Sequence, residues 1–246
     1  LVGHQRQKPP CNALEKIPMI TNQQGAMALS LLLTGVGLAT GLTATEAAAQ
    51  PFPEDTSAAD REIYIAPLKS LNDSLTEQSP LGLATIFIRG DELRMYVIAE
   101  GLPPDMAHLR HYHGFTQGNE AVCPTDDVDA NGDGVVDLRE TEATSGVTLV
   151  PFHDDPASLE GLLDTERFPV ASSEGGIDYR ETVSVQELEA ALQSQYDIGE
   201  LNVENRVVFI HGVGENVIVP DSAASIADVP ASTTLPIACG EFTRID

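Results

Sequence analysis

The feature that most limits how this chain can fold is a series of short β-rich runs separated by turn residues. Two of these runs, residues 83–89 and 93–100, flank a tight turn at Gly90-Asp91-Glu92, and this arrangement predicts a β-hairpin. Short strands that alternate with turn signals are typical of a mostly β fold, either a sandwich or a barrel. The other predicted strands are residues 64–68, 146–151, 177–183, 206–212 and 235–243.

One helix is predicted among the strands. Ser184 and Glu187 fit the Ser-x-x-Glu pattern of a capping box, which marks a helix start, and the helix is expected to run to about Gly199. Its apolar residues recur at helical spacing and indicate one buried face, so we interpret it as a cover packed on the β domain. These residues are Val185, Leu188, Leu192 and Tyr196.

The first 49 residues have the three parts of a secretory signal peptide. A basic stretch precedes an apolar run at residues 26–42, and Ala47-Ala48-Ala49 supplies an A-x-A cleavage site. An uncleaved membrane anchor is the alternative. Residues 50–62 are expected to form a linker and residues 63–246 the folded domain, located in the periplasm or outside the cell.

The chain is strongly acidic, with 38 Asp and Glu against 13 Lys and Arg and a net charge of −25. After residue 49 its only lysine is Lys69. Because no basic patch is present, nucleic acids and anionic membrane surfaces are poor partners. Such acidity suits either a soluble secreted protein or a high-salt habitat, and the sequence leaves both open.

Cysteine usage predicts one disulfide. Cys11 lies in the expected signal peptide, which leaves Cys123 and Cys239. An even number of cysteines in an exported protein implies pairing. The bond would close a loop long enough to stabilise the fold by roughly 4–5 kcal/mol in the chain-entropy treatment.

Two histidines separated by one residue form the first candidate site. On a strand, His111 and His113 point to the same face, and a pair of imidazoles suits Cu, Zn or Ni when two more ligands come from elsewhere. His108 falls on the opposite face and is the weaker candidate. The alternative is a pair of surface histidines on an edge strand.

An acidic loop forms the second candidate site. Residues 129–140 match the twelve-residue calcium loop, with Gly134 at its sharp turn and Glu140 as the closing bidentate ligand. The alternative is an acidic surface turn. Pro124 argues against a helix before the loop, so we interpret the loop as an insertion into another fold. The predicted Ca²⁺ ligands are Asp129, Asn131, Asp133, Val135, Asp137 and Glu140.

Taken in order, three elements of the chain resemble the copper–zinc superoxide dismutase superfamily: the run His111-Tyr112-His113, a strand that ends in His211, and the late motif Ala238-Cys239-Gly240. The part from Leu81 to Gly114 is also similar to bacterial CHRD-type domains. The resemblance covers about residues 63–245, with insertions. It implies a Greek-key β-sandwich or barrel in which Cys123 and Cys239 match the family disulfide.

Carried over residue by residue, the resemblance makes His111, His113 and His211 copper ligands. His153 would be the fourth ligand, shifted along the chain by the inserted calcium loop. The simple alternative for His153 is a surface histidine beside Asp154 and Asp155.

The chain also departs from the family pattern. No histidine lies between His153 and His211, so the zinc half of the family site is lost and zinc is not expected. No arginine occurs at residues 233–237, where the family places one to guide superoxide, and a fast enzyme for an anion depends on local positive potential.

Three hypotheses follow from these features. The preferred one is a secreted metal-binding β-sandwich with a structural calcium loop and a histidine copper site. The second is a copper-only superoxide dismutase, which converts superoxide to hydrogen peroxide and oxygen. The third keeps the fold as an adhesive or envelope module without a transition metal.

Overall fold

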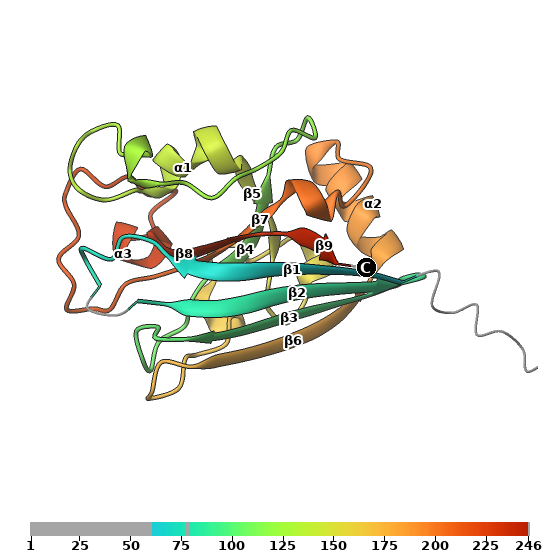
Figure 1. Ribbon diagram of the computed structural model, residues 1–246, viewed down its shortest axis with the longest axis horizontal. Helices are drawn as coiled ribbons and strands as arrows, with labels where there is room; N and C mark the ends of the chain where they lie inside the picture. Colours follow the sequence, from blue (N-terminus) through green and yellow to red (C-terminus); the bar gives the residue numbers. More distant parts are fainter. Residues whose placement is uncertain (1–60, 77–78, 246) are drawn as a thin grey trace, which may run out of the picture. The chain divides into compact units, whose positions relative to one another are not determined.

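The computed structural model describes residues 61–76 and 79–245, which build one curled antiparallel sheet (Figure 1). The strand order is β5-β4-β7-β8-β1-β2-β3-β6, and β9 pairs with β1. Because β5 and β6 end this order, the sheet is a half-barrel with two open edges. The prediction of a mostly β fold of sandwich or barrel type is confirmed at this level.

The described residues contain nine strands and three α-helices. The strands are β1 Arg61–Ser70, β2 Leu81–Arg89, β3 Glu92–Glu100, β4 Arg110–Gly114, β5 Val147–Pro151, β6 Ile177–Ser184, β7 Val207–His211, β8 Pro236–Glu241 and β9 Thr243–Ile245. The helices are α1 Leu138–Ser145, α2 Val185–Tyr196 and α3 Ala231–Thr234.

Strand β1 joins the two halves of the sheet. It pairs with β2 from Arg61 to Leu68, and its last residues, Lys69 and Ser70, pair with β8. Alternate side chains of the strands point inward, and the core fills the space between the two halves. Core side chains from both halves include Ala66, Ile86, Met95, Val97, Tyr112, Val150, Val208, Ile210 and Ile237.

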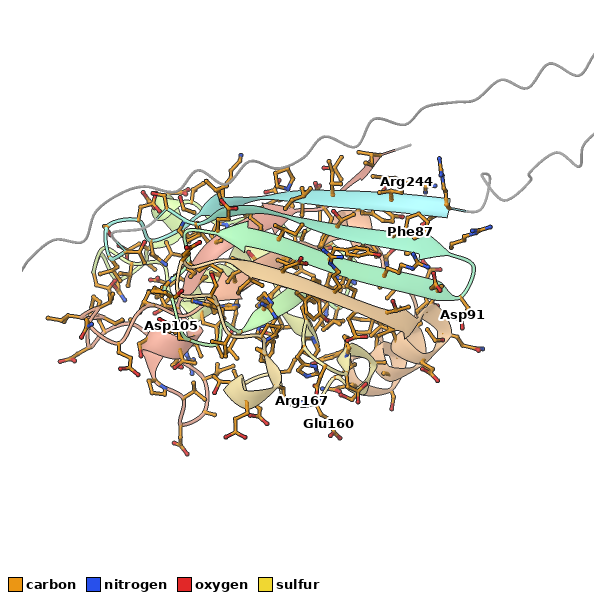
Figure 2. The ribbon with its side chains drawn as sticks, turned by 90° about the horizontal axis from the view of Figure 1, so that it is seen from below. Phe87, Asp91, Asp105, Glu160, Arg167 and Arg244 are labelled. Carbon is orange, nitrogen blue, oxygen red and sulfur yellow. A yellow bond between two sulfur atoms is a disulfide. The ribbon has the colours of Figure 1, made fainter. Side chains whose placement is uncertain are left out.

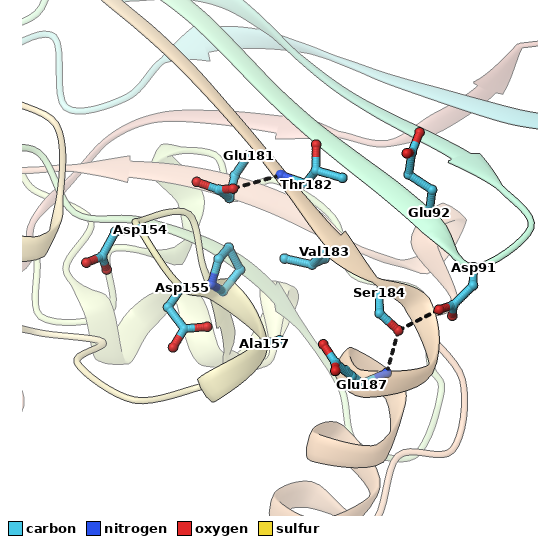
Figure 3. A pocket seen from close by; sticks show the side chains of 11 residues that line it. Asp91, Glu92, Asp154, Asp155, Ala157, Glu181, Thr182, Val183, Ser184 and Glu187 are labelled. Carbon is cyan, nitrogen blue, oxygen red and sulfur yellow. Dashed lines mark hydrogen bonds between the residues drawn. The ribbon is translucent and has the colours of Figure 1, made fainter.

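The predicted β2–β3 hairpin is confirmed, with register from Leu81↔Glu100 to Arg89↔Glu92. Gly90 has a φ of 57°, a left-handed conformation that glycine adopts at low cost. The turn also holds α2, because the Asp91 carboxylate accepts a hydrogen bond from the Ser184 hydroxyl at 2.8 Å (Figure 3). It accepts a second one from the Gln186 amide at 2.9 Å.

Helix α2 begins where the sequence predicts. The Ser184 hydroxyl accepts a hydrogen bond from the Glu187 amide at 3.1 Å and acts as the N-cap. Leu188 and Leu192 are both 1% exposed, and burying each such side chain contributes roughly 1.5–3 kcal/mol. The helix ends at Tyr196 rather than near Gly199, because Asp197 takes a left-handed conformation.

Several strand boundaries differ from the expected ones. Strand β1 begins at Arg61, two residues before the expected domain start. The predicted strand 235–243 is divided, since Leu235 caps α3 and Phe242 separates β8 from β9. The expected signal peptide and the linker up to residue 60 lie outside the described residues.

Helix α1 is absent from the sequence prediction. Asp137 and Glu140 form a capping box, in which each side chain accepts a hydrogen bond from the other residue's backbone. The Asp-x-x-Glu pattern is itself a helix-start signal, but the calcium-loop prediction uses both residues as Ca²⁺ ligands. None of the helices within the described residues is long and apolar enough to cross a membrane.

The predicted disulfide between Cys123 and Cys239 is confirmed, with the two Cα atoms 5.8 Å apart, inside the range that such bonds require. It ties the loop after β4 to strand β8. An intramolecular disulfide fits an extracellular or periplasmic location.

Replacing Cys123 and Cys239 together with serine is expected to lower the free energy of unfolding by up to about 4–5 kcal/mol. The bond joins residues 116 positions apart and restricts the unfolded chain. Urea denaturation of the oxidised protein measures the change. In reductant, the wild type and the variant should unfold at the same urea concentration, and equal midpoints without reductant would contradict the prediction.

Candidate metal centre

The candidate centre lies where strands β4 and β7 pair. The strands are antiparallel, with His111 opposite Phe209 and His113 opposite Val207. Because side chains alternate along a strand, His111, His113 and His211 all point to the same side of the sheet. The other side of β4 carries Tyr112 into the core.

The three histidines form a compact cluster. One ligand nitrogen from each lies within 4.8 Å of the others, and the ring centroids are 5.3–5.8 Å apart. Among the residues that the structure describes, no other group of three or more His, Cys, Asp or Glu meets this criterion. The cluster could therefore hold a metal ion, and imidazole donors are compatible with copper.

All three side chains are buried, with exposures of 2%, 1% and 2% for His111, His113 and His211. Strand β4 lies between β5 and β7. The alternative of two surface histidines on an edge strand is therefore wrong.

Hydrogen bonds determine which nitrogen of two rings carries the proton. His111 Nε2 lies 2.7 Å from the Leu162 carbonyl oxygen, and His211 Nδ1 lies 2.8 Å from the Thr234 carbonyl oxygen. A carbonyl oxygen only accepts, so these nitrogens must donate. The other nitrogen of each neutral ring then carries a lone pair, and backbone acceptors of this kind orient histidine ligands in metal sites.

The remaining nitrogens have no hydrogen-bond partner. They are His111 Nδ1, His113 Nδ1 and His211 Nε2, and all three are buried. His113 Nε2 has only a long contact of 3.4 Å, to the Thr148 hydroxyl. A buried polar atom without a partner costs about 1–3 kcal/mol, so three in one cluster call for a physical explanation.

The electrostatic surroundings favour neutral imidazoles. Burial, followed by the charge of neighbouring histidines, lowers the pKa of His111 and His113 well below the ordinary value. Burial lowers the pKa of His211 to about 4, although its hydrogen bond to Thr234 opposes the shift. Neutral imidazole is the form that binds metals.

A cavity of about 10 Å³ adjoins His111 and His211. A volume of this order holds about one small particle the size of a water molecule. Apolar side chains from Leu109, Leu163 and Ile226 contribute to its lining. The space beside these two rings therefore has room for one ion or water.

The structure does not bring His153 into the cluster. The Asp155 amide donates to His153 Nδ1 at 3.1 Å, and His153 Nε2 lies 2.8 Å from the Glu160 carbonyl oxygen. Both ring nitrogens are thus engaged, and a copper role for His153 stays a prediction that requires the ring to turn. His153 is 0% exposed, so the simple alternative of a surface histidine is wrong.

His108 supports the cluster from outside it. Its Nδ1 lies 2.9 Å from the His211 carbonyl oxygen, and its Nε2 lies 2.8 Å from the Pro103 carbonyl oxygen. The ring therefore contacts the backbone of His211, and neither nitrogen is available to an ion in this arrangement.

In the predicted calcium loop, the acidic side chains bind the loop's own backbone. Asp129 accepts from the amides of Gly132 and Gly134 at 2.8 and 2.9 Å, and Glu140 accepts from Ala130 at 2.8 Å. Gly134 has a φ of 87°, which fits the expected sharp turn. Asp137 caps α1. Calcium binding by this loop stays a prediction.

Sequence reasoning missed the residues that surround the histidines. Leu162 and Thr234 contribute backbone carbonyls, which any residue type could supply, so no sequence signal marks them. Phe168 packs against His111 and His153, with ring centroids 5.5 and 5.2 Å away. Its position depends on how the loop after β5 folds.

Comparisons with known proteins do not assign this chain to a family. No family profile matches it, and no curated protein sequence matches it. Any function must therefore be argued from the arrangement of its own residues.

The metal-free protein is expected to lose stability as the pH falls from about 7.5 to 5. In the folded state the three histidines have depressed pKa values, whereas unfolded histidine titrates near 6.5. The unfolded chain binds more protons in this window, so acid favours unfolding, by about 1.4 kcal/mol for each unit of depression. Melting curves with a chelator at several pH values measure the effect.

The His113→Gln variant is the control, because it removes one of the buried histidines whose pKa is depressed. Its melting temperature should depend less steeply on pH than that of the wild type. Identical slopes would show that the buried histidines do not cause the loss.

Proposed function

We propose that this protein binds one transition-metal ion, copper in the first place, through His111, His113 and His211. The observation that carries the proposal is the set of three buried ring nitrogens without hydrogen-bond partners. The carbonyls of Leu162 and Thr234 fix the lone pairs of two of them toward the unpartnered side. A bound ion would satisfy all three atoms at once.

Copper is the metal that this donor set favours. Imidazole suits Cu, Zn, Ni and Fe, and among divalent ions of the first row the affinity of a nitrogen site is greatest for Cu²⁺. Nitrogens about 2 Å from one ion would lie closer together than the 4.8 Å limit of the cluster. Small changes in side-chain torsion would close that gap.

The buried position favours a structural or metal-retaining role over rapid catalysis. Each ligand ring is at most 2% exposed, and the adjoining cavity of about 10 Å³ has room for one small particle. Leu162 and Phe168, both in the segment between β5 and β6, contact the His111 ring, so a substrate that approached from their side would have to displace them. A metal ion that stays bound permanently requires no such movement.

The superoxide dismutase-like type of the half-barrel is part of the proposal. In its support, β4 with the two histidines pairs with β7, which ends in His211, and β7 pairs with β8, which carries Cys239. The order of ligands and disulfide that suggested the resemblance is thus matched by neighbouring strands. The CHRD-type resemblance has no comparable spatial support.

Replacing His111 and His113 together with glutamine is expected to weaken copper binding by more than about 100-fold, beyond the 10–100-fold loss typical of outer-shell changes. Two of the three proposed ligands disappear, while the large apolar core side chains remain. Copper stoichiometry and affinity, measured on chelator-treated and reloaded protein, test this.

His153→Gln is the matched control, because His153 is equally buried but bound to backbone groups. Its copper affinity should stay near that of the wild type, and an equal loss would return His153 to the ligand set. Unchanged binding in the double variant would overturn the proposed site. Superoxide consumption by the loaded wild type near the 10⁸–10⁹ M⁻¹s⁻¹ ceiling would favour the dismutase alternative.

We also propose that residues 129–140 hold a structural Ca²⁺ ion. The specific support is the shape of the loop: Asp129, Asn131 and Asp133 turn their oxygens onto backbone amides inside it, and Glu140 closes it. The Asn72 side chain fixes the loop to the sheet, since it accepts from the Val136 amide at 2.7 Å and donates to the Val136 carbonyl at 3.0 Å.

Millimolar Ca²⁺ is expected to raise the melting temperature of the wild type, because an ion that binds only the folded state stabilises it by about 2.7 kcal/mol at a hundredfold excess over Kd. Glu140→Gln should abolish most of the shift, and Asp129→Asn should reduce it. The comparison is a melting curve with Ca²⁺ against one with chelator.

Asp126→Asn serves as the control, since Asp126 is an acidic neighbour outside the twelve residues and should leave the calcium shift intact. If the wild type melts at the same temperature with and without Ca²⁺, the loop is an acidic turn and no more.

A further inference from the structure

The outward side of strands β1, β2 and β3 carries a group of large apolar side chains, although no core of the described residues lies on that side. Alternate residues of these strands face away from the half-barrel interior, and the register places Ile63 beside Phe87, and Leu83 beside Ile98. We call this surface the outer sheet face. Figure 2 shows its strands side by side, with Phe87 labelled on β2.

Large apolar side chains on the outer sheet face are unusually exposed to solvent. Leu81 is 61% exposed, Leu83 42% and Ile98 53%, and Ile245 of β9, which pairs with Ile63, is 41% exposed. These four make up half of the eight exposed large hydrophobic residues in the described part of the chain. A contiguous apolar patch of this kind marks an interaction site more often than scattered single residues do.

The outer sheet face carries more basic than acidic residues, whereas the chain as a whole is strongly acidic. Of the 10 Lys and Arg among the described residues, five occupy outward positions of β1, β2, β3 and β6, but only three of the 31 described Asp and Glu do. The cations are Arg61, Lys69, Arg89, Arg94 and Arg180, and the carboxylates are Glu92, Glu100 and Asp178.

Several of these charges lack an ion-pair partner in the part of the chain that the structure describes. Arg94 pairs with Glu92 at 2.7 Å, and Arg180 pairs with Asp178 at 2.8 Å. Among the described residues, no carboxylate lies within 4.0 Å of Arg61, Lys69 or Arg89. The face thus has an apolar centre and a charged rim, the usual anatomy of a protein interface.

We propose that the outer sheet face is the contact between two copies of this chain. Elsewhere, two copies would bring strongly acidic surfaces together and repel one another. The outer sheet face carries both basic and acidic side chains, so the charges of one copy can pair with opposite charges of the other. A two-fold axis along the strands, midway between β2 and β3, would place Leu83 on Ile98 and Arg89 on Glu92 of the other copy, as a symmetric dimer requires.

The size of the face suits a dimer of moderate affinity. The four neighbouring strands β1, β2, β3 and β6 have eight to ten residues each and span about 30 Å by about 15 Å at ordinary strand spacing. Stable interfaces bury about 800 Å² per partner and weaker ones less. The expected dimer therefore dissociates in the micromolar range.

Sedimentation of the purified full chain over a range of concentrations tests the proposal. The wild type should change from the 26.2 kDa chain to twice that mass as its concentration rises through the micromolar range. The Leu83→Glu/Ile98→Glu variant should stay monomeric, with dimerisation weakened at least 100-fold. Its melting curve should match that of the wild type monomer, because both side chains are exposed.

The matched control is Val170→Glu/Ile218→Glu, which adds the same charge at residues that are 62% and 90% exposed but lie off the face. It should dimerise like the wild type. A wild type that stays monomeric up to about 100 µM, or a dimer that survives the Leu83→Glu/Ile98→Glu change, would overturn the proposal. A monomer would leave the face to another occupant, such as the residues preceding β1.

Discussion

The antiparallel pairing of β4 with β7 is the contact on which both the core and the candidate metal centre depend. It aligns His111 with Phe209 and sets His211 on the face that also carries His113. The same pairing sends Tyr112 and Val208 into the core. Because side chains alternate with a period of two, a shift of one residue would exchange the two faces. Core packing thus holds the histidines in register, since such a slip would place imidazoles in the core.

The folded chain buries three histidine ring nitrogens of the cluster without hydrogen-bond partners. Natural proteins pair most buried polar groups, and here the backbone pairs one nitrogen of His111 and one of His211 while leaving the other free. Arg110, beside His111, is also buried and has two unpartnered nitrogens, but it stacks over the Tyr179 ring at 5.0 Å. The histidine nitrogens have no comparable compensation, and this difference supports the proposed metal site.

Much of this arrangement could be predicted from the sequence, because it rests on local patterns. The Gly90 turn, the Ser184 cap and the period-two pair of His111 and His113 each follow from a few adjacent residues. The disulfide followed from counting cysteines, which needs no geometry. The carbonyls of Leu162 and Thr234 could not be predicted, since they lie in irregular segments and act through backbone atoms. The assignment of His153 came from ligand order alone, and order carries no information about which way a ring points.

The two candidate ion sites share one segment of chain. The segment after β7 returns to the acidic loop, where the Ser222 hydroxyl donates to Asp133 and the Ala224 amide donates to Asp137 at 2.6 Å. It then reaches Thr234, whose carbonyl accepts from His211 Nδ1. Order in the loop therefore positions the group that orients a proposed copper ligand. Loss of the Asp133 and Asp137 carboxylates would remove both of these contacts between the segment and the loop.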